Sequence, residues 1–141
     1  MNTLKTIFCG YSLLMTLALS AQEKSFPENI PYRTKIEVST DALEKLFHVS
    51  GSFTMQLAPS FTLTGSVQNR IEKEASVSTI LIKTENLQGA TLSLSRSLKS
   101  DGSVQYTGHL LKLHDADGML LIEKDGHYYF IRTEQRFLVS E

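Results

Sequence analysis

An alternation of apolar and polar side chains between Ser52 and Leu98 constrains this chain more than any other feature. The polar half of the alternation is almost entirely hydroxyl, as in the run Phe61-Thr62-Leu63-Thr64. Successive side chains of a strand point to opposite faces, so each run predicts a strand with one buried face and one wet face. We expect the chain after Gly51 to be β-structure throughout.

Short connections rich in turn residues join the predicted strands. Asp125-Gly126 is the strongest hairpin signal, and the segments 99–102 and 115–118 predict two further hairpins. Connections this short cannot carry parallel crossovers, so consecutive strands should pair antiparallel. The expected strands span residues 35–38, 52–57, 61–71, 76–84, 90–98, 103–113, 119–123, 127–132 and 136–139. The fold class predicted is all-β, an antiparallel meander of about eight strands.

An open meander leaves an unpaired edge at each end, and closure into a small or rolled β-barrel removes this liability. Gly65 and Gly108 lie inside predicted strands, where they favour the bends of a small barrel. An open β-sandwich is the alternative. The expected inward side chains are Phe53, Met55, Leu57, Phe61, Leu63, Val67, Ile80, Ile82, Leu92, Leu94, Val104, Leu111, Leu113, Leu120, Ile122 and Phe130.

A short helix is predicted ahead of the meander, over residues 41–48. Asp41 and Glu44 have the spacing of a capping box. Three apolar residues then share one helical face: Leu43, Leu46 and Phe47. We expect this helix to cover one end or edge of the sheet, with a partner-binding helix as the alternative.

The first 21 residues read as a cleaved signal peptide. Lys5 precedes a mostly apolar run, and small residues from Ala18 to Ala21 suit a signal peptidase. The alternative, an uncleaved anchor, needs roughly 20 apolar residues, and the run is shorter. We therefore expect a secreted or periplasmic protein with no membrane span after cleavage. An extended leader over residues 22–34 would precede a single β-barrel domain over residues 35–141.

The net charge and the cysteine content argue against three kinds of site: a nucleic-acid interface, a thiol nucleophile and a cysteine zinc site. The net charge is −1, and losing Lys5 with the signal peptide makes it one unit more negative. With no basic stripe, nucleic acid is not an expected partner. Cys9 would leave with the signal peptide, which excludes a thiol nucleophile and a cysteine zinc site.

The remaining polar residues do not form a recognisable catalytic or metal-binding pattern. Three histidines lie in or beside the last hairpins: His109, His114 and His127. His109 and His114 are an odd number of residues apart, so they should face opposite ways. Asp115 and Asp117 resemble the front of a calcium loop, but apolar residues follow, and we interpret them as an acidic turn. There is no G-x-S-x-G elbow. We expect no cofactor, no metal and no enzymatic activity.

Protein contact is the one positive functional signal. Uncharged hydroxyl positions cost little to dehydrate, and Ser and Thr lose little side-chain entropy on contact. The leader contains prolines and could enter a partner's cleft as a strand-like peptide. Soluble strand filling is the alternative interpretation of the hydroxyl residues. The predicted partner contacts are Pro27, Ile30, Pro31, Tyr32, Thr62, Thr64, Ser66, Thr91, Ser93 and Ser95.

In its size, exported start, β-rich body and extended leader, the chain resembles small secreted OB-like bacterial protease inhibitors of the potempin type. This resemblance of architecture implies an inhibitor of a secreted peptidase, and it assigns no family residue to this sequence. A structural or assembly component of the bacterial cell envelope is the alternative, using an edge near residues 137–139. A small-ligand carrier is a further alternative, although large inward side chains argue against a cavity.

Overall fold

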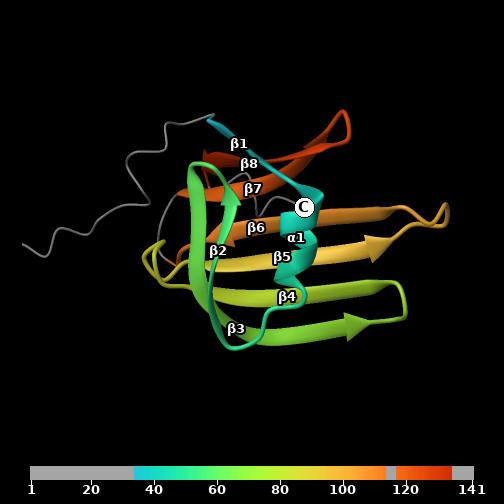
Figure 1. Ribbon diagram of the computed structural model, residues 1–141, viewed down its shortest axis with the longest axis horizontal. Helices are drawn as coiled ribbons and strands as arrows, with labels where there is room; N and C mark the ends of the chain where they lie inside the picture. Colours follow the sequence, from blue (N-terminus) through green and yellow to red (C-terminus); the bar gives the residue numbers. More distant parts are fainter. Residues whose placement is uncertain (1–33, 114–116, 135–141) are drawn as a thin grey trace, which may run out of the picture.

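The computed structural model describes residues 34–113 and 117–134, which form one antiparallel eight-stranded sheet and one short helix (Figure 1). The predicted all-β fold with a single short helix is confirmed. The predicted strand over 136–139 and leader residues 22–33 lie outside the described residues. In chain order the elements are β1 (Lys35–Val38), α1 (Thr40–Leu46), β2 (Ser52–Ala58), β3 (Phe61–Lys73), β4 (Val77–Thr84), β5 (Thr91–Leu98), β6 (Val104–Leu111), β7 (Asp117–Lys124) and β8 (His127–Glu134).

The sheet rolls into a nearly closed barrel. Its strand order is β1-β8-β7-β6-β5-β4-β3-β2, so β2 to β8 form a continuous meander and β1 returns to pair with β8. The two edge strands, β1 and β2, approach each other across a seam. Among the described residues no strand pairing closes this seam, so the facing edges of β1 and β2 are unpaired there.

Helix α1 connects the two edge strands and crosses the inner side of the sheet, over β4 to β6 in Figure 1. It begins after Ser39, whose Oγ accepts a hydrogen bond of 3.1 Å from the Ala42 N–H. The capping box predicted at Asp41 is therefore wrong, because the serine two residues earlier caps the helix. At the other end, the Arg70 guanidinium on β3 donates to the carbonyls of Phe47 and Val49. These bonds satisfy the carbonyl of the C-cap residue Phe47 and that of Val49 in the loop that follows.

The core lies between α1 and the inner face of the sheet. The prediction of inward residues is correct for β3 to β5, where Leu63, Ile80, Ile82, Leu92 and Leu94 are fully buried. Phe130 of β8 is buried as predicted, and Phe61 packs edge-on against it. The helix adds Leu43 and Leu46, both completely buried. Half-buried Phe53, Met55 and Val67 pack against this cluster.

The prediction of inward residues is wrong for most of β6 and β7, where Tyr106, Leu110, Met119 and Leu121 are buried instead. Leu111, Leu120 and Ile122 lie outward, and Leu113 follows the end of β6. Val104 lies on the inward face as predicted, but it is 42% exposed at the start of its strand. Leu113 is 79% exposed. Both faces of β7 are apolar, so alternation cannot identify its inner face, and the adjacent Leu110 and Leu111 leave the same ambiguity at the end of β6.

Two turns test the hairpin predictions. Asp125 and Gly126 have φ values of 53° and 77°, as a type I′ turn requires, which confirms the predicted hairpin. The turn expected over 115–118 is wrong in part, because Asp117 and Gly118 already belong to β7. Asp115 lies outside the described residues.

Both strand glycines sit where neighbouring main chains approach closely. A Cβ at Gly65 would collide with the Lys83 carbonyl oxygen of β4. A Cβ at Gly108 would lie 2.8 Å from the Ser93 carbonyl oxygen of β5. Only glycine fits such positions without moving a strand, so these residues allow the sheet to curl tightly.

Candidate protein-binding site

The outer edge of β2 is one of the two sheet edges that the described residues leave unpaired, the other being the edge of β1. β2 pairs only with β3, and among residues 34–113 and 117–134 no backbone hydrogen bond joins it to β1 or α1. An edge strand of this kind presents unpaired N–H and C=O groups that can accept another strand. Which groups are free follows from the register of β3.

The main-chain groups of Thr62 and Thr64 turn toward β4. Asn86 supplies both bonds there, accepting from the Thr64 N–H at 2.9 Å and donating to the Thr62 carbonyl at 2.7 Å. The alternate residues of β3, Leu63 and Gly65, must therefore bond to β2, where they lie opposite Met55 and Phe53. It follows that Ser52, Thr54 and Gln56 turn their N–H and C=O groups away from β3, toward the seam.

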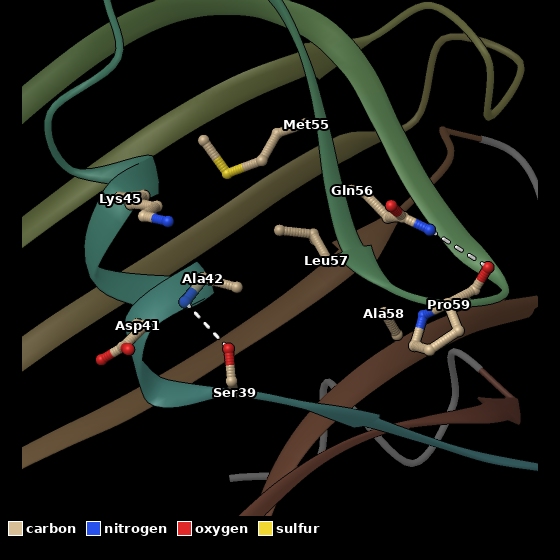
Figure 2. Close-up of a pocket in the computed structure, with 9 residues that line it drawn as sticks. All are labelled: Ser39, Asp41, Ala42, Lys45, Met55, Gln56, Leu57, Ala58 and Pro59. Atoms are coloured by element: carbon tan, nitrogen blue, oxygen red, sulfur yellow. Dashed lines mark hydrogen bonds between the residues drawn. The ribbon is translucent and has the colours of Figure 1, made fainter.

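A cavity of about 470 Å³ opens beside this edge, between β2 and α1 (Figure 2). Its floor is apolar: Ala42, Leu57 and Ala58 are buried and Met55 is half-buried. Met55 and Leu57 point from β2 toward the helix. A side chain from an added strand could therefore leave water and pack against this floor.

The rim of the cavity is polar, and some of its groups already have partners. Ser39 Oγ caps the helix, and Gln56 Nε2 donates to the Pro59 carbonyl at 3.2 Å. Asp41 and Lys45 are exposed, carry opposite charges and lie one helical turn apart. The cavity therefore suits an apolar side chain flanked by polar or charged residues of either sign.

A polar cluster around Glu44 holds α1 against the inner side of β5 and β6. Its Oε2 accepts from the Tyr106 hydroxyl at 2.5 Å and its Oε1 from Arg96 Nη1 at 2.5 Å. His48 Nε2 lies 3.3 Å from the same Oε1. Partial burial opposes ionisation, but the Tyr106 hydrogen bond and the Arg96 charge outweigh it and keep the pKa of Glu44 below its usual value. The carboxylate is therefore ionised at neutral pH and ties the helix to β5 and β6.

The aromatic surroundings reinforce this anchor. The Arg96 guanidinium lies over the Phe47 ring, 5.3 Å from its centroid. The Tyr128 hydroxyl accepts a hydrogen bond of 3.2 Å from the Tyr106 N–H, and the two rings pack edge to face. Burial and the hydrogen bond to Glu44 raise the pKa of Tyr106 well above its usual value. Tyr106 thus stays a hydrogen-bond donor across the physiological range.

The hydroxyl residues predicted as partner contacts all lie on the outer face, but in separate groups. Thr62, Thr64 and Ser66 belong to β3, whereas Thr91, Ser93 and Ser95 belong to β5, with β4 between them. Lys83 stands between Ser66 and Thr91 in the register, so a charge interrupts the uncharged surface. Their role in binding stays a prediction. The other predicted contacts, Pro27, Ile30, Pro31 and Tyr32, lie outside the described residues.

Some predicted hydroxyl contacts already bond to other hydroxyls. Thr64 Oγ1 lies 3.1 Å from Thr54 Oγ1, and Ser95 Oγ lies 2.8 Å from Thr79 Oγ1. Thr54 belongs to the free edge strand, so Thr64 is the predicted residue nearest to the candidate site in the register. The cavity-lining residues were missed in the sequence; the separation of β1 from the meander by a helix is the signal that could have revealed them.

The structure places the histidines and acids considered as metal ligands apart. His109 faces outward from β6, His127 Nδ1 lies 2.8 Å from Glu37 Oε1, and His114 lies outside the described residues. Within residues 34–113 and 117–134 no three metal-ligating side chains gather at one place. Asp117 is buried and accepts a 2.6 Å hydrogen bond from Arg132 Nη2, a contact that sequence reasoning missed.

Comparisons of the chain with protein-family models, with curated proteins and with solved structures found no match. In the part of the chain that the structure describes, no helix has the length and apolar character needed to cross a membrane. The case for function therefore depends on the free edge of β2 and its cavity.

Proposed function

We propose that this chain is an exported, non-enzymatic binding protein that captures an extended segment of a partner protein by adding it as a strand to β2. The single observation that carries the proposal is the unpaired edge at Ser52, Thr54 and Gln56 beside the apolar-floored cavity. In strand addition, main-chain hydrogen bonds supply affinity, and pockets for alternate side chains supply specificity. The edge and the cavity are suited to these two roles.

The specific form that we propose is an inhibitor of a secreted peptidase. Three features support it. The first is the predicted signal peptide, and the second is the predicted leader, which directly precedes β1 in the sequence. The third is the edge of β2, which can pair with an extended segment of the enzyme. In the alternative, the same edge accepts a strand from another component of the bacterial cell envelope. In both forms no cofactor takes part.

One substitution at the edge tests strand addition directly. Thr54→Pro removes the outward N–H, and proline is tolerated on an edge strand whose N–H faces solvent. The matched control, Thr54→Val, keeps the N–H and loses only the hydroxyl. We expect Thr54→Pro to weaken binding at least about tenfold, the size of effect that losing one well-formed hydrogen bond produces. Equal binding by wild type and both variants would contradict the proposal.

The peptidase form has its own test. The purified chain is added to serine, cysteine and metallopeptidases, and hydrolysis of a peptide substrate is followed. We expect stoichiometric inhibition of at least one class, and loss of inhibition when residues 22–33 are deleted if the leader is the reactive segment. A partner that is bound through the Thr54 edge but is not a peptidase would favour the envelope alternative.

A further inference from the structure

A second surface of the barrel, independent of the β2 edge, is unexpectedly apolar. Strand β7 reads Met119-Leu120-Leu121-Ile122, and Met119 and Leu121 are buried in the core. Leu120 and Ile122 must therefore point outward. A strand that is apolar on both faces is typical of a sheet that is covered on both sides. Here the helix covers only the inner side.

The register extends this feature across neighbouring strands. Ile131 of β8 lies opposite Leu120, and Tyr129 of β8 lies opposite Ile122. Leu111 of β6 adds a fifth side chain one register step away, opposite Gly118. We call these five half-buried residues the outer apolar patch: Leu111, Leu120, Ile122, Tyr129 and Ile131. Exposed His109 of β6 lies directly opposite Leu120 and forms the polar border of the patch on that side. A contiguous apolar patch on a sheet face marks an interaction surface.

The charges at the border of the patch indicate what covers it. Lys35 and Glu37 lie on β1, opposite Ile131 and Tyr129, and both are exposed. Glu37 Oε1 lies 2.8 Å from His127 Nδ1, and Lys35 Nζ lies 5.8 Å from the centroid of the Tyr129 ring, but the Glu37 side chain stays 59% exposed and can still meet a second cation. They lie two residues apart on the outward face and carry opposite charges. A partner of one charge sign would meet repulsion at one of them. A second copy of this chain, docked about a two-fold axis, can instead place each Lys35 against the other copy's Glu37.

We propose that the protein forms a symmetric dimer through the outer apolar patch. Leu120, Ile122 and Ile131 form the apolar centre, and the β1 charges set the relative orientation of the two copies. No residue of the patch belongs to the free edge of β2 or lines its cavity. The dimer therefore leaves two independent sites for strand addition, and its failure would not affect the proposed function.

Light scattering during size-exclusion chromatography tests the dimer. The full chain of 141 residues has a mass of 15.8 kDa, and removal of the predicted signal peptide lowers it. We expect the wild type at micromolar concentration to have twice the single-chain mass of the form that is purified. Leu120→Glu should elute as a single chain, because it buries a charge at the centre of the interface. The matched control, Ser97→Glu, places the same charge on the outer face of β5 and should stay dimeric. A single-chain mass for the wild type would overturn the proposal, as would a dimer formed by Leu120→Glu.

Exchanging the two charges of β1 tests the dimer with exposed side chains, so a loss of dimerisation cannot be explained by misfolding of the barrel. Lys35→Glu changes an exposed side chain and should weaken dimerisation at least about tenfold, whereas Lys35→Glu combined with Glu37→Lys should restore it. Circular dichroism of each variant checks that the barrel is intact. Unchanged dimer affinity in Lys35→Glu would overturn the assigned orientation. Lipid or another protein bound to a single chain in native mass spectrometry would overturn the choice of occupant.

Discussion

Glu44 of α1 and Tyr106 of β6 are joined by a 2.5 Å hydrogen bond across 62 residues of sequence. The same carboxylate binds Arg96 of β5, so one side chain connects the helix to two neighbouring strands. Because α1 forms one wall of the cavity beside β2, this cluster also fixes the width of the candidate binding site. The anchor of the helix is thus part of the proposed binding mechanism.

The first prediction concerns this anchor. Glu44→Gln keeps the shape of the side chain but removes the charge that Arg96 and Tyr106 bind. Hydrogen bonds to a charged group contribute about 1.5–3 kcal/mol, and the partial exposure of Glu44 lowers our expectation to about 1–2 kcal/mol of unfolding free energy. Urea unfolding at pH 7 measures the loss. Glu72→Gln, an exposed acid on β3, is the control and should change stability little.

The pH dependence of this difference gives a second prediction. The pKa of Glu44 is lower in the folded chain than the ordinary value of 4.5 for a glutamate side chain. Its contribution is therefore fully present above pH 4.5 and is lost as the pH falls through the folded pKa. Wild type and Glu44→Gln should converge in stability at acidic pH. A gap that stays constant from pH 7 to acid would show that the charge of Glu44 does not stabilise the fold.

Arg70 provides a third prediction, at the end of α1. Its guanidinium donates to the carbonyls of Phe47 and Val49, which follow the helix. Arg70→Met keeps the aliphatic part of the side chain and removes both bonds, and we expect a loss of about 1–2 kcal/mol. Amide hydrogen exchange should quicken in α1 more than in β5. Lys73→Met removes a charge at the exposed end of the same strand and should leave exchange in α1 unchanged.

The tight curl of the sheet leads to a fourth prediction. At Gly65 an added Cβ would meet the Lys83 carbonyl oxygen, a main-chain atom that cannot move without shifting β4. Gly65→Ala should cost about 1–3 kcal/mol, the range for a steric insertion into a packed structure. Thermal unfolding measures the loss, and Ser66→Ala, one residue along the strand, is the control. Equal melting temperatures would show that β3 and β4 can separate without penalty.

How much of the fold could be predicted depended on how polar each outer face is. In β3 and β5, hydroxyl residues alternate with Leu63, Leu92 and Leu94, so the pattern identifies the buried face. In β7, Leu120 and Leu121 are equally apolar, and only the pairing of the strands decides which one is buried. The outward residues Leu120 and Ile122 make the alternation in β7 ambiguous, and the same residues form the outer apolar patch.

The candidate site was less accessible to sequence reasoning than the fold. Its cavity combines Ser39 and Ala42 from the helix region with Met55 and Leu57 from β2, and no local motif connects them. The free edge of β2 exists because β1 pairs with β8, which lies about 90 residues later in the sequence, and not with β2. Local patterns do not report such a choice, whereas the type I′ turn at Asp125 depends only on adjacent residues.

The last prediction concerns Asp117 and Arg132, a buried pair that joins β7 to β8 with a 2.6 Å contact. Both side chains are largely buried, at 11% and 8% exposed. Removing one member of a buried pair leaves the other charge uncompensated, which costs about 3–5 kcal/mol. We therefore expect Arg132→Met to unfold at a clearly lower urea concentration than the wild type.

The double variant Asp117→Leu with Arg132→Met separates the penalty of an unpaired charge from the contribution of the pair. Replacing both members of a buried pair by apolar groups is often neutral, so the double variant should recover most of the stability that Arg132→Met loses. A double-mutant cycle from urea unfolding measures this coupling. If the two losses simply add, the pair does not hold β7 against β8, and the stability of that strand pair must come from its apolar contacts.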